Sequence, residues 1–106
     1  MIIIDAILTR IEETIFENIN VLYAESPDKN IKVSMDLPNI IKDILNSKKL
    51  VEGIPIKLFI VNSEDETLPN DIDFEAVGRV FKIISKENKK SFHISIGGLS
   101  LMLECE

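Results

Sequence analysis

The sequence predicts an α+β domain in which two helices from the N-terminal half pack on a mainly antiparallel sheet of about four to five strands. Two observations support this fold class. Apolar residues near the N-terminus recur at steps of three and four, which is typical of an amphipathic helix. The C-terminal third alternates apolar and polar residues around a glycine pair, which is typical of a β-hairpin. The chain has 106 residues, and we assign residues 1–106 to a single domain.

The first predicted helix covers residues 2–24. Its apolar residues share one helical face: Ile4, Leu8, Ile11, Ile15, Ile19 and Leu22. The ordinary structural interpretation of this apolar stripe is core packing against the sheet. The alternative is a homodimer through this helix, because a small domain covers so long a stripe only in part. An isoleucine-rich start is also compatible with a strand over the first few residues.

A short strand and a second helix are predicted next. Residues 31–35 alternate apolar and polar side chains, which favours a half-buried strand. Asp36 is placed as the N-cap of a helix over residues 37–50, with Pro38 in its first turn. Gly53 is placed to end that helix.

Two further segments complete the middle of the chain. Residues 56–61 form a strand in which Ile56, Leu58 and Ile60 face one way. For residues 74–86 we favour a strand from about Arg79, because the segment is rich in strand-forming residues. A helix over 74–86 is the alternative, since acidic residues precede basic ones there. The predicted order is α-β-α-β-β-β-β.

The C-terminal residues predict a hairpin around Gly97-Gly98, since glycine adopts the positive φ angles of a two-residue turn without steric cost. If Ile96 lies opposite Leu99, six apolar residues share one face: Phe92, Ile94, Ile96, Leu99, Leu101 and Leu103. The other face then carries Ser91, His93, Ser95, Ser100, Met102 and Glu104.

Charge is distributed unevenly along the chain. Residues 64–75 hold six acidic residues and no basic one, and the remaining 12 acidic residues balance the 12 basic ones, so the net charge of −6 lies in this acidic loop. A basic block from Arg79 to Lys90 follows it. The negative total argues against nucleic acid as a partner. The one cysteine, Cys105, excludes an internal disulfide and favours a cytoplasmic protein. No apolar run is long enough for a membrane span.

Two groups of residues resemble chemical sites but lack features that those sites require. His93 is the one histidine, and Ser91 and Ser95 share its strand face. Serine-histidine catalysis is not expected, because the chain has no nucleophile elbow and a flat exposed sheet face does not exclude water. Asp71, Asp73 and Glu75 have the alternate spacing that begins a calcium loop. That loop requires glycine and glutamate where this chain has Ala76 and Lys82. We therefore expect no enzyme activity, no metal and no cofactor.

The stretch from His93 to Leu99, HISIGGL, resembles the D/N-x-S-x-x-G signature of PilZ domains, which bind cyclic dinucleotides. Gly78-Arg79-Val80 also resembles a strand start of that family. The resemblance covers only these two short segments. His93 stands where the family has Asp or Asn, and the paired-arginine motif is missing. The resemblance implies a nucleotide or other phosphate ligand near Arg79.

We expect a small acidic, non-catalytic binding protein, such as an inhibitor, an immunity-type protein or an accessory protein. Its protein partner would have a basic surface and would contact the acidic loop and an exposed sheet face. The residues assigned to this contact are Glu64, Asp65, Glu66, Asp71, Asp73, Glu75, His93 and Met102. The alternative is a ligand-sensing module that binds a nucleotide or other phosphate through Arg79, Lys82 and Ser95.

Overall fold

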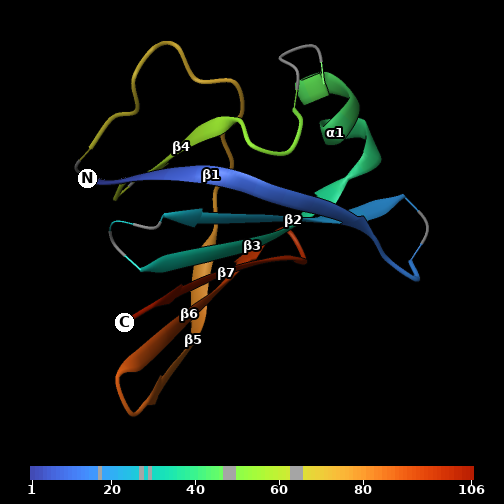
Figure 1. Cartoon of the computed structure of the whole chain (residues 1–106). Helices are drawn as coiled ribbons and strands as arrows, with labels where there is room; N and C mark the ends of the chain where they lie inside the picture. Colours follow the sequence, from blue (N-terminus) through green and yellow to red (C-terminus); the bar gives the residue numbers. More distant parts are fainter. Residues whose placement is uncertain (17, 27, 29, 47–49, 63–65) are drawn as a thin grey trace.

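The fold is described from a computed structural model of the whole chain (Figure 1). The structure describes residues 1–106 except residues 17, 27, 29, 47–49 and 63–65. The side chains of residues 44 and 46 also lie outside the description. Within these described residues the chain forms seven strands and one short helix. In chain order they are β1 (Ile2–Glu13), β2 (Ile19–Ser26), β3 (Ile31–Pro38), α1 (Asn39–Asn46), β4 (Pro55–Ile60), β5 (Arg79–Lys86), β6 (Lys89–Ile96) and β7 (Leu99–Cys105).

All seven described strands belong to one antiparallel sheet, with the order β4-β1-β2-β3-β7-β6-β5. The predicted α+β class, with two helices and four to five strands, is therefore wrong. The sheet twists strongly, so that β5 and β6 are steeply inclined to β1 and β2 (Figure 1). Strands β4 and β5 are the two edges of the sheet.

The N-terminal region, residues 2–24, forms the β1–β2 hairpin instead of the predicted helix. Ile4, Ala6 and Leu8 alternate on the core side and are buried. The register then shifts between Leu8 and Arg10. This bulge inserts one extra residue, so Ile11 returns to the core side and packs against the core. Core positions 4, 8 and 11 thus imitate the spacing of a helical face.

A homodimer through the predicted N-terminal helix loses its basis, because the proposed apolar stripe does not exist as one surface. Leu8 is 1% exposed, whereas Ile15 is 94% exposed at the β1–β2 turn. That turn is held by Thr14, whose hydroxyl donates to the carbonyl of Ile19 at 2.9 Å. Asn18 closes it with a positive φ of 67°, a conformation that asparagine tolerates better than most residues.

The helix predicted over residues 37–50 starts later than expected and is described as far as Asn46; residues 47–49 lie outside the described residues. Strand β3 continues to Pro38, and α1 begins at Asn39. A residue before proline is disfavoured in the helical region, so Leu37 stays extended and is buried in the core at 1% exposure. Asp36 is therefore not an N-cap. Its carboxylate accepts a hydrogen bond from the backbone N–H of Ser100 at 2.9 Å, which ties the end of β3 to the start of β7.

Gly53 does not end α1, because Leu50 and Val51 already lie outside the helix. It lies in the turn before β4 with a φ of 91°. Its N–H donates to the carbonyl of Leu8 at 2.8 Å, and the N–H of Leu8 donates to the carbonyl of Ile54 at 2.9 Å. These bonds extend the β1–β4 pairing to the position of the bulge.

The C-terminal half agrees with the sequence expectations. The strand predicted over residues 56–61 is β4, and the strand favoured from Arg79 is β5, so the helical alternative for 74–86 is wrong. The hairpin register is confirmed: Ile96 pairs with Leu99, and the pairing continues through Ile94 with Leu101 and Phe92 with Leu103.

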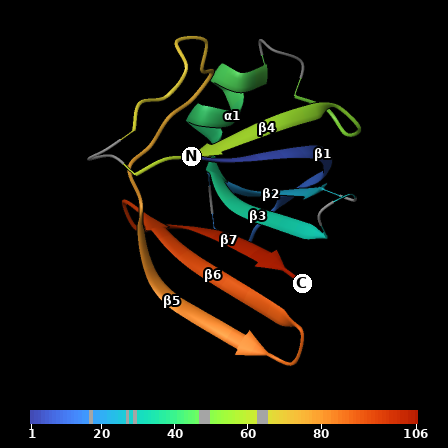
Figure 2. The same ribbon diagram turned by 90° about the vertical axis from the view of Figure 1, so that its left-hand side faces the viewer.

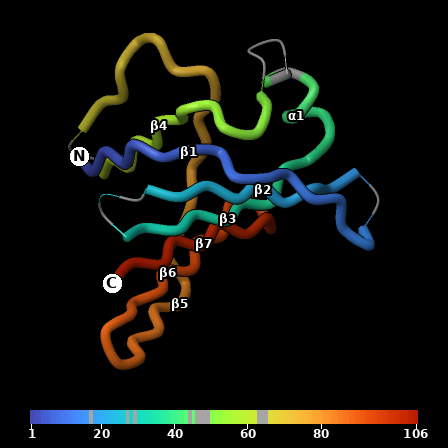
Figure 3. Tube along the Cα trace, in the orientation of Figure 1, coloured from blue at the N-terminus to red at the C-terminus, as the bar shows by residue number. Residues whose placement is uncertain are grey.

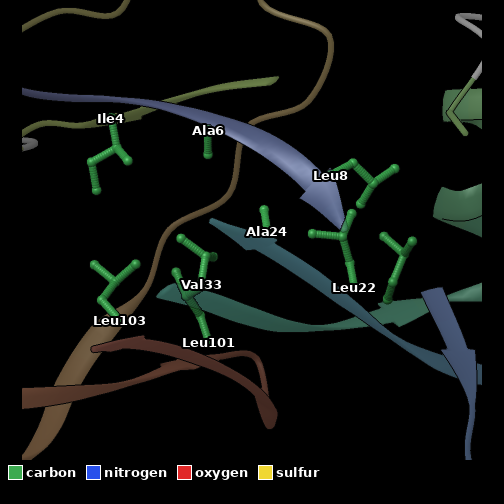
Figure 4. Close-up of a cluster of buried hydrophobic side chains, with 9 residues drawn as sticks. Ile4, Ala6, Leu8, Leu22, Ala24, Val33, Leu101 and Leu103 are labelled. Atoms are coloured by element: carbon green, nitrogen blue, oxygen red, sulfur yellow. The ribbon is translucent and has the colours of Figure 1, made fainter. Parts of the chain in front are cut away.

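The core lies on one side of the sheet (Figure 4). It consists of nine buried side chains: Ile4, Ala6, Leu8, Leu22, Ala24, Val33, Leu37, Leu101 and Leu103. They come from β1, β2, β3 and β7, the middle of the sheet. Residues Ile41 and Leu45 of α1 pack against this cluster, as do Leu50 and Ile54.

Helix α1 and the turn of the β5–β6 hairpin lie at opposite ends of the molecule in both views (Figures 1 and 2). Residues 66–78, which belong to the connection between the two edge strands, arc outside the sheet before the chain descends to β5 (Figure 3). No helix in the described part of the chain is long and apolar enough to cross a membrane.

Candidate functional site

Strand β5 is exposed along its whole length, although its sequence is rich in large apolar residues. Val80 is 49% exposed, Phe81 60%, Ile83 57% and Ile84 39%. We call these four residues the apolar edge. Single exposed apolar residues are common in soluble proteins, but four within five positions of one strand form a contiguous feature that calls for an explanation.

The register places the apolar edge on both faces of the sheet. Val80 pairs with Ile94, and Ile83 pairs with Phe92. Ile94 and Phe92 pack against the core, so Val80 and Ile83 lie on the core side. Ile84 pairs with Ser91, which lies on the outer side. The remaining residue, Phe81, lies where the β5–β6 register shifts.

The bulge at Phe81 brings its ring next to His93 on the outer side. The two ring centroids are 6.2 Å apart, and the rings are inclined by 60°. A bulge of this kind re-aims a side chain. As a result, apolar side chains border the free edge of β5 on both faces of the sheet.

The outer face of β5, β6 and β7 unites five of the residues predicted from the sequence. Arg79 pairs with Ser95, Lys82 with His93, and His93 with Met102. His93, Ser95 and Met102 are half-buried, whereas Arg79 and Lys82 are exposed. These residues lie on an open sheet face, and none of them lines either of the two cavities next to α1.

The acidic loop is only partly described. Glu64 and Asp65 lie outside the described residues. Glu66 accepts a hydrogen bond from the N-terminal amine of Met1, and another from the backbone N–H of Asn62 at 3.1 Å. The bond from the N-terminal amine is the main reason that the pKa of Glu66 lies below its ordinary value. This contact holds Glu66 near the β1–β4 edge of the sheet, which is the edge opposite β5.

The other three acidic residues, Asp71, Asp73 and Glu75, are exposed in the segment that leads to β5. Phe74, which lies among them, is 43% exposed and lines a small apolar cavity. The structure therefore does not unite all six predicted acidic residues with His93 and Met102 into one surface.

Two of the cavities formed by the described residues adjoin α1. The first has a volume of about 30 Å³ and lies between Leu37, Ile41, Phe74, Ile96 and their neighbours. It has room for about one water molecule. The second, of about 370 Å³, is open and polar, and lies between the β1–β2 turn and α1. There the amide of buried Asn20 donates to the Oδ1 atom of Asn39 at 2.5 Å.

No group of three or more histidine, cysteine, aspartate or glutamate side chains within the described residues is placed to hold a metal ion. Cys105 is free, and its Sγ atom lies 3.7 Å from the carbonyl oxygen of Lys90.

Sequence reasoning missed the apolar edge. A signal for it was present in Val80-Phe81-Lys82-Ile83-Ile84, because this run does not alternate strictly between apolar and polar residues. A strand without alternation has apolar side chains on both faces. Whether other elements cover those faces depends on the sheet order, which the sequence does not state.

Comparison with models of known protein families finds no match, and no curated protein matches the sequence.

Proposed function

We propose that this protein is a small, non-catalytic binding protein that engages a protein partner through β5 and the adjoining outer face of β6. The observation that carries this proposal is the apolar edge. Its residues belong to a hairpin that projects from the end of the molecule opposite α1 (Figure 2). Apolar surface concentrated on a projecting element is typical of a protein contact.

The surroundings of the apolar edge support the same proposal. Lys82 and Arg79 border it on the outer face, and Lys86 and Lys89 lie at its turn. An apolar centre with a charged rim is the usual anatomy of an interface. The exposed Asp71, Asp73 and Glu75 would add long-range attraction to basic groups of the partner, which raises association rates more than affinity.

A capture experiment tests the proposal. The protein is immobilised in three forms: wild type, Phe81→Ser with Ile83→Ser, and the control Ile15→Ser with Phe16→Ser. Ile15 and Phe16 are exposed apolar residues at the β1–β2 turn, so the control removes comparable surface elsewhere. Circular dichroism first establishes that all three forms are folded.

We expect specific host proteins to be retained by the wild type and by the control, and to be lost with the β5 variant. If all three forms retain the same proteins, β5 is not the contact surface. Retention of nucleic acid or of a nucleotide in place of protein would favour the phosphate-binding alternative at Arg79, Lys82 and Ser95.

A further inference from the structure

We propose that the partner adds an extended segment of its own to the free edge of β5, as an additional antiparallel or parallel strand, and that this segment alternates apolar and acidic residues. This inference rests on the proposed function and specifies how the contact is made. It follows from three features of β5: its position in the sheet, its apolar side chains on both faces, and its charge.

The position of β5 leaves one side of its backbone without a partner strand among the described residues. It is the last strand in the sheet order, and its ladder is formed with β6 alone. Each edge strand presents N–H and C=O groups that another strand can pair with. No proline lies within β5 to interrupt such pairing.

The apolar side chains of β5 fit an added strand better than a partner that docks on one face. Val80 and Ile83 lie on the core side, whereas Phe81 and Ile84 lie on the outer side. A partner on either face alone would leave two of these four residues in water. An added strand of alternating sequence places its apolar side chains next to Val80 and Ile83 on the core side. Its acidic side chains then lie next to Arg79 and Lys82 on the outer side, since successive strand residues point to opposite sides.

The basic residues of β5 argue against a second copy of this chain as the occupant. A symmetric antiparallel pairing about the middle of β5 would put Arg79 opposite Lys86. Like charges that lie directly opposite one another destabilise a strand pair. Lysines and bulges are also the usual features by which an edge strand avoids self-association. An acidic strand turns the same charges into favourable cross-strand pairs.

The experiment uses a short synthetic peptide with blocked ends, in which valine and glutamate alternate, added to the full-length protein. Hydrogen exchange of the backbone amides is followed by NMR. We expect backbone amides of β5 to exchange about tenfold more slowly when the peptide concentration is about tenfold above the Kd, because these amides then exchange only in the peptide-free protein. Amides of β4, the other edge strand, serve as the internal control.

Two matched peptides identify the mode of binding. The first keeps the side chains but has methylated backbone nitrogens, so it cannot donate hydrogen bonds to β5. The second replaces glutamate by lysine. Both are expected to bind more weakly. The variant Lys82→Glu should weaken the glutamate peptide by about two- to fivefold and favour the lysine peptide, as expected for one cross-strand charge pair.

Equal binding of the methylated peptide, or no slowing of β5 exchange at millimolar peptide, would overturn strand addition. So would a dimer of the chain that Phe81→Ser abolishes, or displacement of the peptide by a single-stranded oligonucleotide. If host proteins still depend on β5 in the capture experiment while the peptide result is negative, the proposed function stands and only strand addition fails. If capture does not depend on β5, the proposed function fails as well.

Discussion

Replacement of Leu101 by alanine tests the core side of the sheet most directly. Leu101 is 6% exposed in the middle of the sheet, between Met35 on β3 and Ile94 on β6. Truncation removes about three buried carbon groups, and at about 0.8 kcal/mol for each the lost transfer free energy is about 2.4 kcal/mol. The cavity left behind adds to this loss, and truncation of buried leucines costs about 2–5 kcal/mol in total.

Met35 and Ile94 are only half-buried, so they can move partly into the space. We therefore expect Leu101→Ala to lower the free energy of unfolding by about 3 kcal/mol, in the lower half of that range. Urea unfolding followed by far-UV circular dichroism is the suitable assay, because the chain has no tryptophan.

The matched control is Ser100→Ala, at the neighbouring position on the outer side. This change keeps the backbone N–H that donates to Asp36, so its cost should stay below about 0.5 kcal/mol, as for most surface substitutions. If the two variants unfold at the same urea concentration, or if Leu101→Ala costs less than about 1 kcal/mol, the assignment of faces in β7 is wrong.

Three further predictions concern other parts of the fold. Gly78→Ala should destabilise the protein by about 1–3 kcal/mol in thermal unfolding, because a Cβ atom there would lie 2.7 Å from the Cγ2 atom of Ile94; an unchanged melting temperature would contradict this close approach. Asn20→Ala should cost about 1–3 kcal/mol in urea unfolding, because it removes the buried amide that donates to Asn39. Asn39→Ala should cost less, since Asn39 is exposed. The pKa of Glu66 should lie below the ordinary glutamate value in an NMR titration, and acetylation of the N-terminal amine should raise it. The stabilising contribution of Glu66 is then complete at neutral pH and is lost as the pH falls through this lowered pKa.

The regions that the sequence predicted correctly are those in which local signals agree with one another. Gly97 and Gly98 fix a two-residue turn with φ angles of 57° and 90°, and the alternation on both sides of them then determines the register of β6 and β7. Strand β5 followed from its strand-forming residues. The same logic placed His93 and Met102 side by side on the outer face, as the structure has them.

The helix predicted over residues 2–24 was wrong for an identifiable reason. A bulge after Leu8 changes which alternate residues face the core, so a strand acquires apolar positions three and four residues apart. The β1–β2 turn contains neither glycine nor proline in the sequence ETIFEN, and its positive φ at Asn18 gives no strong signal. Because β1 is hydrogen-bonded to both β2 and β4, tertiary pairing outweighed the local helical pattern.

The sequence by itself determined the charge distribution, the C-terminal hairpin with its two faces, and the strand character of residues 79–86, since each depends on residues close together in the chain. Only the tertiary structure decided that these residues form an edge. Burial depends on which elements, distant in sequence, come to lie beside a strand. The middle of the sheet is covered by α1, Leu50 and Ile54, whereas β5 lies at the far end of the strand order, so its apolar side chains stay exposed.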